Sequence, residues 1–194
     1  MKAPLLALLL GLTSLSHAAD SNLEQLFQAI QSRNFSDTEA LLNQIEDPNT
    51  ILRGLTAVRI AIKNDDIRTL QLLQANKAVV SADDLIYAAE FGKTQTVRLL
   101  LQQGMSVETA DPYEITLLIY AALNGHYEMV KTLLNHGANI EAREVVEGYN
   151  ALILASAHGY ADIVKLLLDQ GADKSIEATA VKRRRIRPEQ DRDL

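Results

Sequence analysis

The sequence contains no cysteine among its 194 residues. This absence excludes a disulfide framework, a thiolate metal site and a lipid-bearing cysteine near the N-terminus. The chain also has only 4 prolines, and 47% of its residues are hydrophobic. Because this composition differs from that of disordered and collagen-like chains, we expect one soluble domain with a sizeable core.

The only long apolar stretch lies at the N-terminus, from Pro4 to Leu15. It is about a dozen residues long, well short of the roughly 20 that span a bilayer. The positive start at Lys2 and the small residues before Ala19 predict a secretory signal peptide over residues 1–18, cleaved after Ala18. We therefore expect a periplasmic or secreted protein without a membrane span after cleavage, and favour a bacterial periplasm.

Motifs of catalytic chemistry are absent from the sequence. It has no Gly-x-Ser-x-Gly elbow, phosphate-binding loop, dinucleotide fingerprint or His-Glu-x-x-His pattern. The three histidines that follow the signal segment, His126, His136 and His158, lie in turns, where we expect structural or solvent-facing roles. We predict no catalytic residue, no cofactor, no metal site and no enzyme activity.

Two pairs of adjacent acids, Asp65-Asp66 and Asp83-Asp84, are the other candidates for acid–base chemistry or calcium binding. Adjacent side chains point in different directions, which disfavours a shared site. Asp66 and Asp83 also suit helix N-termini, where a carboxylate interacts favourably with the helix dipole. We interpret them as helix caps.

Charge is unevenly distributed along the chain. Residues 19–181 hold 22 acidic and 12 basic side chains, net −10, whereas residues 182–194 carry a net charge of +3. The basic tail contains Lys182, Arg183, Arg184, Arg185 and Arg187. An export signal argues against a nuclear-localisation or nucleic-acid role, so we expect either a solvated tail or a contact with an anionic lipid or an acidic partner.

Three stretches of the chain align with almost no adjustment: residues 88–104, 121–137 and 155–171. Each begins with a small pair such as Ala88-Ala89, breaks at a glycine, continues with a Val-x-x-Leu-Leu pattern and ends at a second glycine. The pattern predicts paired short helices separated by glycine turns. Because helices this short are unstable alone in water, stability must come from packing between repeats.

This unit resembles the ankyrin repeat. Asn124-Gly125-His126 and the segment from Met129 to Ile140 match the second half of that repeat nearly residue for residue, and the segment from Gly148 to Leu152 stands where it opens with Gly-x-Thr-Pro-Leu. The resemblance implies an all-α solenoid of about five helix-turn-helix units with short β-hairpin or loop fingers. One departure is consistent, since the histidine of Thr-Pro-Leu-His is replaced throughout, so its hydrogen bonds between adjacent repeats are not expected.

The repeat extends upstream. Its first alanines are Ala29, Ala61, Ala88, Ala121 and Ala155, with spacings of 32, 27, 33 and 34 residues. We therefore predict a repeat domain over residues 19–176, with repeats at 22–50, 51–80, 81–111, 112–145 and 146–176, followed by a charged tail at 177–194. The 27-residue step predicts a shortened finger between Asn76 and Asp83.

The resemblance implies binding of another protein by the concave face, which is formed from finger tips and first helices. Phe91, Tyr113 and Tyr149 are the aromatic candidates, and Tyr is enriched in binding hot spots, although such rings can equally pack on neighbouring repeats. The full candidate set is Arg53, Lys63, Asn64, Glu90, Phe91, Tyr113, Leu123, Asn124, Glu147, Tyr149 and His158. We expect a monomeric, non-catalytic scaffold in the periplasm that holds, protects or inhibits a partner protein, or alternatively a secreted effector that binds a host protein.

Overall fold

The computed structural model describes residues 21–52 and 54–175. By its internal contacts the chain divides into two compact units, with the boundary between Val80 and Ser81. This boundary falls in the short connection between α4 (Ile67–Ala75) and α5 (Ala82–Glu90). The predicted signal peptide and the charged tail lie outside the described residues and stay predictions, as do the domain and repeat boundaries.

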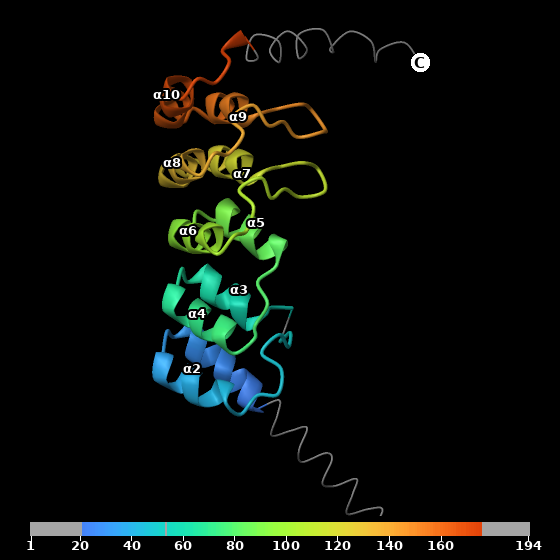
Figure 1. The fold of residues 1–194 in the computed structure, drawn as a ribbon, viewed down its shortest axis with the longest axis vertical. Helices are drawn as coiled ribbons and strands as arrows, with labels where there is room; N and C mark the ends of the chain where they lie inside the picture. The colour runs from blue at the N-terminus through green and yellow to red at the C-terminus, as the bar shows by residue number, and fades with distance from the viewer. Residues whose placement is uncertain (1–20, 53, 176–194) are drawn as a thin grey trace, which may run out of the picture. The chain divides into compact units, whose positions relative to one another are not determined.

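The first unit contains two helix pairs (Figure 1). The first pair is a helix over residues 21–31 with α2 (Phe35–Leu42), and the second is α3 (Ala57–Lys63) with α4. Helix α4 packs against both α2 and α3. Leucine and isoleucine side chains fill the interior of this unit, including Leu26, Ile30, Ile62, Leu70 and Leu73, which are fully buried.

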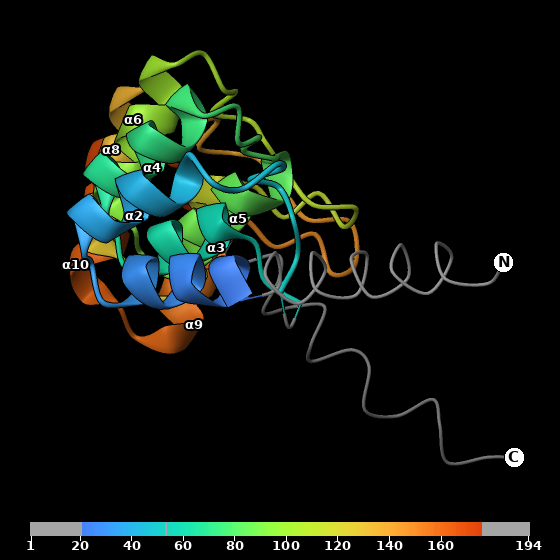
Figure 2. The same cartoon turned by 90° about the horizontal axis from the view of Figure 1, so that it is seen from below.

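The second unit contains three helix pairs, formed by α5 with α6 (Thr94–Gln102), α7 (Leu117–Leu123) with α8 (Tyr127–Asn135), and α9 (Ala151–His158) with α10 (Ala161–Asp169). The first helices α5, α7 and α9 pack in one row, and the second helices α6, α8 and α10 pack in another. Figures 1 and 2 both show the long connections before α7 and α9 on the side away from the second helices. The predicted all-α repeat architecture is confirmed.

Equivalent positions of successive repeats supply the core of the second unit. Leu100, Leu133 and Leu167 are fully buried on the second helices, and Ala88 and Ala121 are fully buried on the first. Each leucine contributes about 1.5–3 kcal/mol through removal of its apolar surface from water, while the small alanines let paired helices approach closely. Packing between repeats therefore stabilises helices that are too short to persist alone.

A left-handed residue closes each turn between paired helices. Gly92, Gly125 and Gly159 have φ of 65°, 74° and 76°, values that glycine adopts without steric cost. The first unit places Arg33 and Asp65 at the same turn, with φ of 58° and 51°. Residues with a side chain accept this conformation at a cost of about 1–2 kcal/mol, so the turns of the first unit are the more strained.

Side chains cap the first helices. Thr56, Thr116 and Asn150 each accept a hydrogen bond from the main-chain N–H three residues later, and Ser81 forms a capping box with Asp84. The predicted N-terminal roles of two acids are confirmed, since Asp66 caps α4 and Asp83 lies in the first turn of α5.

The connections between pairs differ in length. Six residues, 76–81, join α4 to α5, whereas 14 residues, 103–116, join α6 to α7 and 15 residues, 136–150, join α8 to α9. The shortened connection lies where the alanine spacing predicts it. We call residues 103–116 the first finger and residues 136–150 the second finger. Among the described residues, β structure is limited to the isolated bridges Leu52 with Leu55 and Ala110 with Thr116.

Hydrogen bonds between neighbouring repeats come from positions other than the missing histidines. Carboxylate oxygens of Glu108 and Glu141 accept from the main-chain N–H groups of Asn139 and Asp173, at 2.7 and 2.8 Å. In the first unit, the amide oxygen of Asn49 accepts from the main chain of Val79 at 2.7 Å in the same way. Side chains at the bases of the connections thus supply hydrogen bonds between repeats where the replaced histidines do not.

Candidate functional site

Large exposed apolar side chains gather in the connections between helix pairs. Within the described residues, one lies at a helix end, Phe91, and the others lie in connections: Ile51, Leu55, Val79, Tyr113, Val145 and Val146. Among these, Tyr113, Val145 and Val146 belong to the two fingers of the second unit and are 58%, 58% and 66% exposed. Exposed apolar side chains that cluster on one feature indicate an interaction surface more than scattered ones do.

Asp111 fixes the conformation of the first finger. Its Oδ1 accepts hydrogen bonds from the main-chain N–H groups of Tyr113 and Ile115, both at 2.9 Å. Its Oδ2 accepts from the hydroxyl of Tyr120 on α7 at 2.9 Å. Burial, the hydrogen bond to Asp111 and the nearby negative charges of Asp111 and Glu90 together raise the pKa of Tyr120 to about 12. The finger is thus tied to the helix that follows it.

Glu144 has the equivalent role in the second finger. Glu144 is only 8% exposed, and its carboxylate accepts from the main-chain N–H groups of Val146, Glu147 and Tyr149, at 2.6, 2.9 and 2.8 Å. The loop of the second finger is one residue longer than that of the first. It is closed by a main-chain hydrogen bond from Glu144 N–H to the carbonyl of Tyr149, whereas the loop of the first finger is closed by one from Asp111 N–H to the carbonyl of Ile115. The longer side chain of glutamate matches the longer loop.

The two fingers are joined through their main chains. The N–H of Val145 donates to the carbonyl of Tyr113 at 3.0 Å. Together with the carboxylates of Asp111 and Glu144, this bond holds the tips in one arrangement. The exposed side chains Tyr113, Val145 and Val146 are therefore presented by a pre-organised scaffold, which lowers the entropy cost of binding.

The fingers are strongly acidic. Between them they contain six carboxylates and a single base, Arg143, for a net charge of −5. The second helices carry three bases and three acids, for a net charge of 0: Arg98, Lys131 and Lys165 against Glu128, Asp162 and Asp169. The second unit is therefore electrostatically asymmetric, and its finger side attracts cations.

Several of the predicted site residues lie at the C-terminal ends of the first helices. Glu90 and Leu123 are half-buried, whereas Phe91, Asn124 and His158 are exposed. The ring of Phe91 packs 4.5 Å from that of Tyr87, and Asn124 donates to the carbonyl of Tyr120 at 2.9 Å. These residues form a side surface of the first helices rather than part of the finger tips.

The three aromatic candidates do not occupy equivalent positions. Phe91 follows α5, Tyr113 lies at the tip of the first finger, and Tyr149 is the half-buried residue next to the N-cap of α9. Glu147, another predicted residue, is exposed in the second finger. Of the aromatics, Tyr113 alone is an exposed finger-tip residue.

Two predicted residues lie on the first unit, at the end of α3. Lys63 is exposed, while the side-chain amide of Asn64 donates to the carbonyl of Ile30 at 3.1 Å and so links two repeats. Arg53 lies outside the described residues. The tail residues lie outside them as well: Lys182, Arg183, Arg184, Arg185 and Arg187.

Each of the three histidines in the described residues bonds to a main-chain carbonyl. Nε2–H of His126 donates to Glu90, while Nδ1–H of His136 and of His158 donate to carbonyls four residues earlier. No group of three or more metal-ligating side chains occurs within residues 21–52 and 54–175. No helix in this part of the chain has the length and apolar character needed to cross a membrane.

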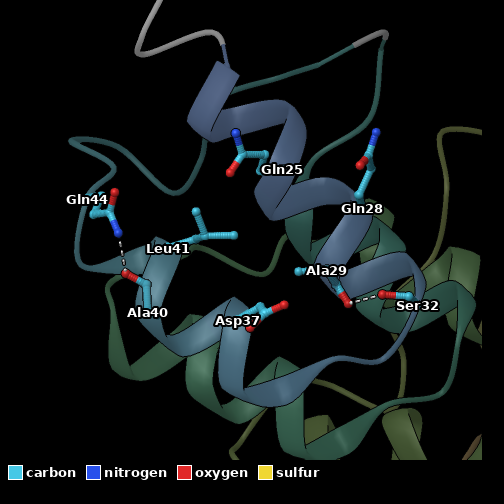
Figure 3. Close-up of a pocket in the computed structure, with 8 residues that line it drawn as sticks. All are labelled: Gln25, Gln28, Ala29, Ser32, Asp37, Ala40, Leu41 and Gln44. Atoms are coloured by element: carbon cyan, nitrogen blue, oxygen red, sulfur yellow. Dashed lines mark hydrogen bonds between the residues drawn. The ribbon is translucent and has the colours of Figure 1, made fainter.

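A groove on the first unit lies between the helix over residues 21–31 and α2 (Figure 3). Its one charged side chain, Asp37, accepts a hydrogen bond from the Asn34 side chain at 2.6 Å. Ser32 and Gln44 donate to main-chain carbonyls within the same two helices. The groove offers no unused charged group, so the fingers are the stronger candidate site.

Sequence reasoning missed Asp111, Glu144, Val145 and Val146. Asp111 carries a usable signal, because Asp followed by Pro is typical of a turn whose aspartate bonds to the main chain two residues on. The two valines carry no such signal, since adjacent valines are more often buried.

Comparison with known families adds a direct match. Residues 85–178 match the family model of ankyrin repeats, in three copies. The described part of the matched range corresponds to the three helix pairs of the second unit. The two helix pairs of the first unit lie outside the matched range. A comparison with curated proteins found no match.

Proposed function

The chain belongs to the ankyrin repeat family, whose repeats generally mediate protein–protein interaction, and we propose that it is a non-catalytic scaffold that binds a partner protein in the periplasm. The exposed apolar side chains at the rigid finger tips, Tyr113, Val145 and Val146, carry this proposal. The absence of catalytic sequence motifs supports a binding role rather than an enzymatic one.

The signal-like N-terminus is the support for the proposed location. Lys2, the apolar run from Pro4 and the small residues before Ala19 fit export through a secretory pathway. In that compartment a stable scaffold can hold, protect or inhibit one partner protein. The same export signal favours a second candidate, a secreted effector that binds a host protein.

Affinity capture from periplasmic extract tests this function. The full chain serves as bait beside a triple variant, Phe91→Ala, Tyr113→Ala and Val146→Ser, which changes three exposed side chains and leaves the buried core intact. A matched control, Arg98→Gln, Lys131→Gln and Lys165→Gln, changes exposed side chains of the second helices.

We expect a partner that the chain and the control capture and the triple variant loses. Loss with the control and retention with the triple variant would place the binding surface on the second helices instead. Capture only from host extract would favour the effector over the periplasmic scaffold, and no partner in either extract would contradict both.

A further inference from the structure

We infer that the two fingers of the second unit bind a cationic protein segment that carries at least one large apolar side chain. This inference rests on the proposed binding function and specifies the chemistry of the partner. Two independent features of the fingers support it, one apolar and one electrostatic.

The apolar feature is the exposed set Tyr113, Val145 and Val146. Tyr113 combines a large contact area with a hydroxyl, the combination that is enriched in binding hot spots. The three side chains come from adjacent fingers that share the bond from Val145 N–H to the Tyr113 carbonyl. Both fingers therefore present exposed apolar side chains close to the bond that joins them, where an apolar side chain of the partner can dock.

The electrostatic feature is the set of carboxylates that the same two fingers carry. Glu114 follows Tyr113 directly, Glu147 follows Val146 directly, and both glutamates are exposed. The more buried carboxylates of Asp111 and Glu144 accept hydrogen bonds from N–H groups, which leaves their negative charge in place. Because the two fingers together hold six acids and one base, they attract a cationic partner and repel an anionic one.

Glu114 also occupies a backbone conformation that disfavours it. Its φ is 58°, and the equivalent residue of the second finger is Gly148, with φ of 73°. Strained residues that persist in a fold occur preferentially at functional sites. The turn does not require a glutamate at this tip, since glycine would satisfy it, and the exposed carboxylate of Glu114 is therefore available to a partner.

The charge of the fingers also bears on other occupants. A second copy that docked through the same surface would bring two groups of net charge −5 together, which is unfavourable. The basic tail of the chain itself, residues 182–194, has the right sign of charge. The experiment must therefore separate an external partner from this tail.

The probe is a short fluorescein-labelled peptide that alternates lysine and valine, and its binding to the full chain is measured by fluorescence anisotropy. We expect saturable binding that weakens as salt increases, and no binding of a peptide that alternates glutamate and valine. A peptide that alternates lysine and serine should bind at least about tenfold more weakly, because it lacks the apolar contact.

Two pairs of substitutions locate the site. Tyr113→Ser with Val146→Ser, and separately Glu114→Gln with Glu147→Gln, should each weaken binding by about tenfold or more. Glu128→Gln with Asp169→Asn removes the same charge from exposed positions on α8 and α10, and should change binding little. Glu114→Gly should weaken binding while raising the melting temperature, a combination that a purely structural role for Glu114 would not produce.

Four outcomes would overturn the inference. Equal binding of the lysine and glutamate peptides would remove its electrostatic basis. Equal effects of the Glu114/Glu147 and Glu128/Asp169 variants would show unspecific attraction. Tighter peptide binding after Arg183→Gln, Arg184→Gln and Arg185→Gln would assign the fingers to the chain's own tail. If the lysine–valine peptide fails to bind while the finger variant still loses the captured partner, the proposed function stands and this partner chemistry is wrong.

Discussion

The imidazole of His126 donates a hydrogen bond from Nε2–H to the main-chain carbonyl of Glu90, at 2.8 Å, and so links two adjacent repeats of the second unit. The same ring lies over Gly92, where an added Cβ would come within 2.8 Å of Nδ1. The next repeat reproduces this packing with a different side chain, because the ring of Tyr160 lies over Gly125 at 2.7 Å from the position of a Cβ.

The contact between His126 and Gly92 predicts an energetic coupling. Gly92→Ala should lower the free energy of unfolding by about 2 kcal/mol or more, since alanine is strained at a positive φ and its methyl group would displace the imidazole. After His126→Ala, the same substitution should cost only the backbone strain, about 1–2 kcal/mol. Urea unfolding of both single variants and the double variant measures the coupling.

Gly104→Ala is the matched control for this cycle. Gly104 also has a positive φ, of 95°, but no atom lies within 4 Å of the position of its Cβ. Its substitution should therefore be additive with His126→Ala. Additive costs for Gly92→Ala and His126→Ala would contradict the contact.

Tyr120 predicts a loss of stability in alkaline solution. Its pKa is raised from 10.0 to about 12 in the folded protein, first by burial and then by the hydrogen bond to Asp111. The unfolded chain releases this proton at lower pH than the folded chain, so this contribution to stability is complete below about pH 10 and is lost as pH rises toward about 12. The Tyr120→Phe variant should lack this part of the decline in urea titrations.

Tyr113→Phe, which alters an exposed ring, serves as the reference for that titration. Phenolate absorbance should also show a late ionisation near pH 12 that disappears in Tyr120→Phe. An unchanged late ionisation in the variant would assign it to another tyrosine.

The hydrogen bonds of Glu144 predict that its substitution would destabilise the second finger. Glu144→Ala removes the acceptor of three main-chain N–H groups and should cost about 2–3 kcal/mol of unfolding free energy, since hydrogen bonds to a charged group are the stronger kind. Glu144→Gln should cost less, because its amide oxygen still accepts. Hydrogen exchange should speed up at the amides of Val146, Glu147 and Tyr149, and unchanged protection there would refute the role.

The left-handed conformation of Lys77 predicts that a glycine at this position would stabilise the first unit. Its φ is 71°, and the equivalent residues of the second unit are the glycines Gly104, Gly137 and Gly171. Lys77→Gly should raise the free energy of unfolding by about 0.5–1 kcal/mol through relief of strain, partly offset by the greater freedom of glycine in the unfolded chain. Thermal unfolding of Lys77→Ala is the control, since alanine keeps the strained Cβ and should give no comparable gain.

The helices and their turns could be predicted from the sequence because the same residue pattern recurs in successive repeats. Glycines at equivalent positions mark both turns, and Leu100, Leu133 and Leu167 mark the core. The short connection before α5 followed from alanine spacing alone. Such features depend on local conformation and periodic burial, which residue type and spacing encode directly.

The candidate site was less predictable because each finger conformation depends on single tertiary contacts. Val145 and Val146 are exposed since Glu144 and the carbonyl of Tyr113 hold their main chain, and neither contact has a periodic signature. Tyr149 was grouped with Tyr113 by residue type, yet it lies half-buried beside the N-cap of α9. The side-chain amide of Asn64 likewise donates a hydrogen bond to the carbonyl of Ile30, a tertiary contact that has no signature in the sequence.

The pairing of Asp111 with a shorter loop and Glu144 with a longer one has an evolutionary consequence. The length of the acidic side chain matches the length of the loop. A loop that is one residue longer can therefore be held by a side chain that is one methylene longer, without any change in the helices. New finger tips can then arise by small insertions accompanied by a single exchange between aspartate and glutamate, while the folded repeats beneath them stay the same.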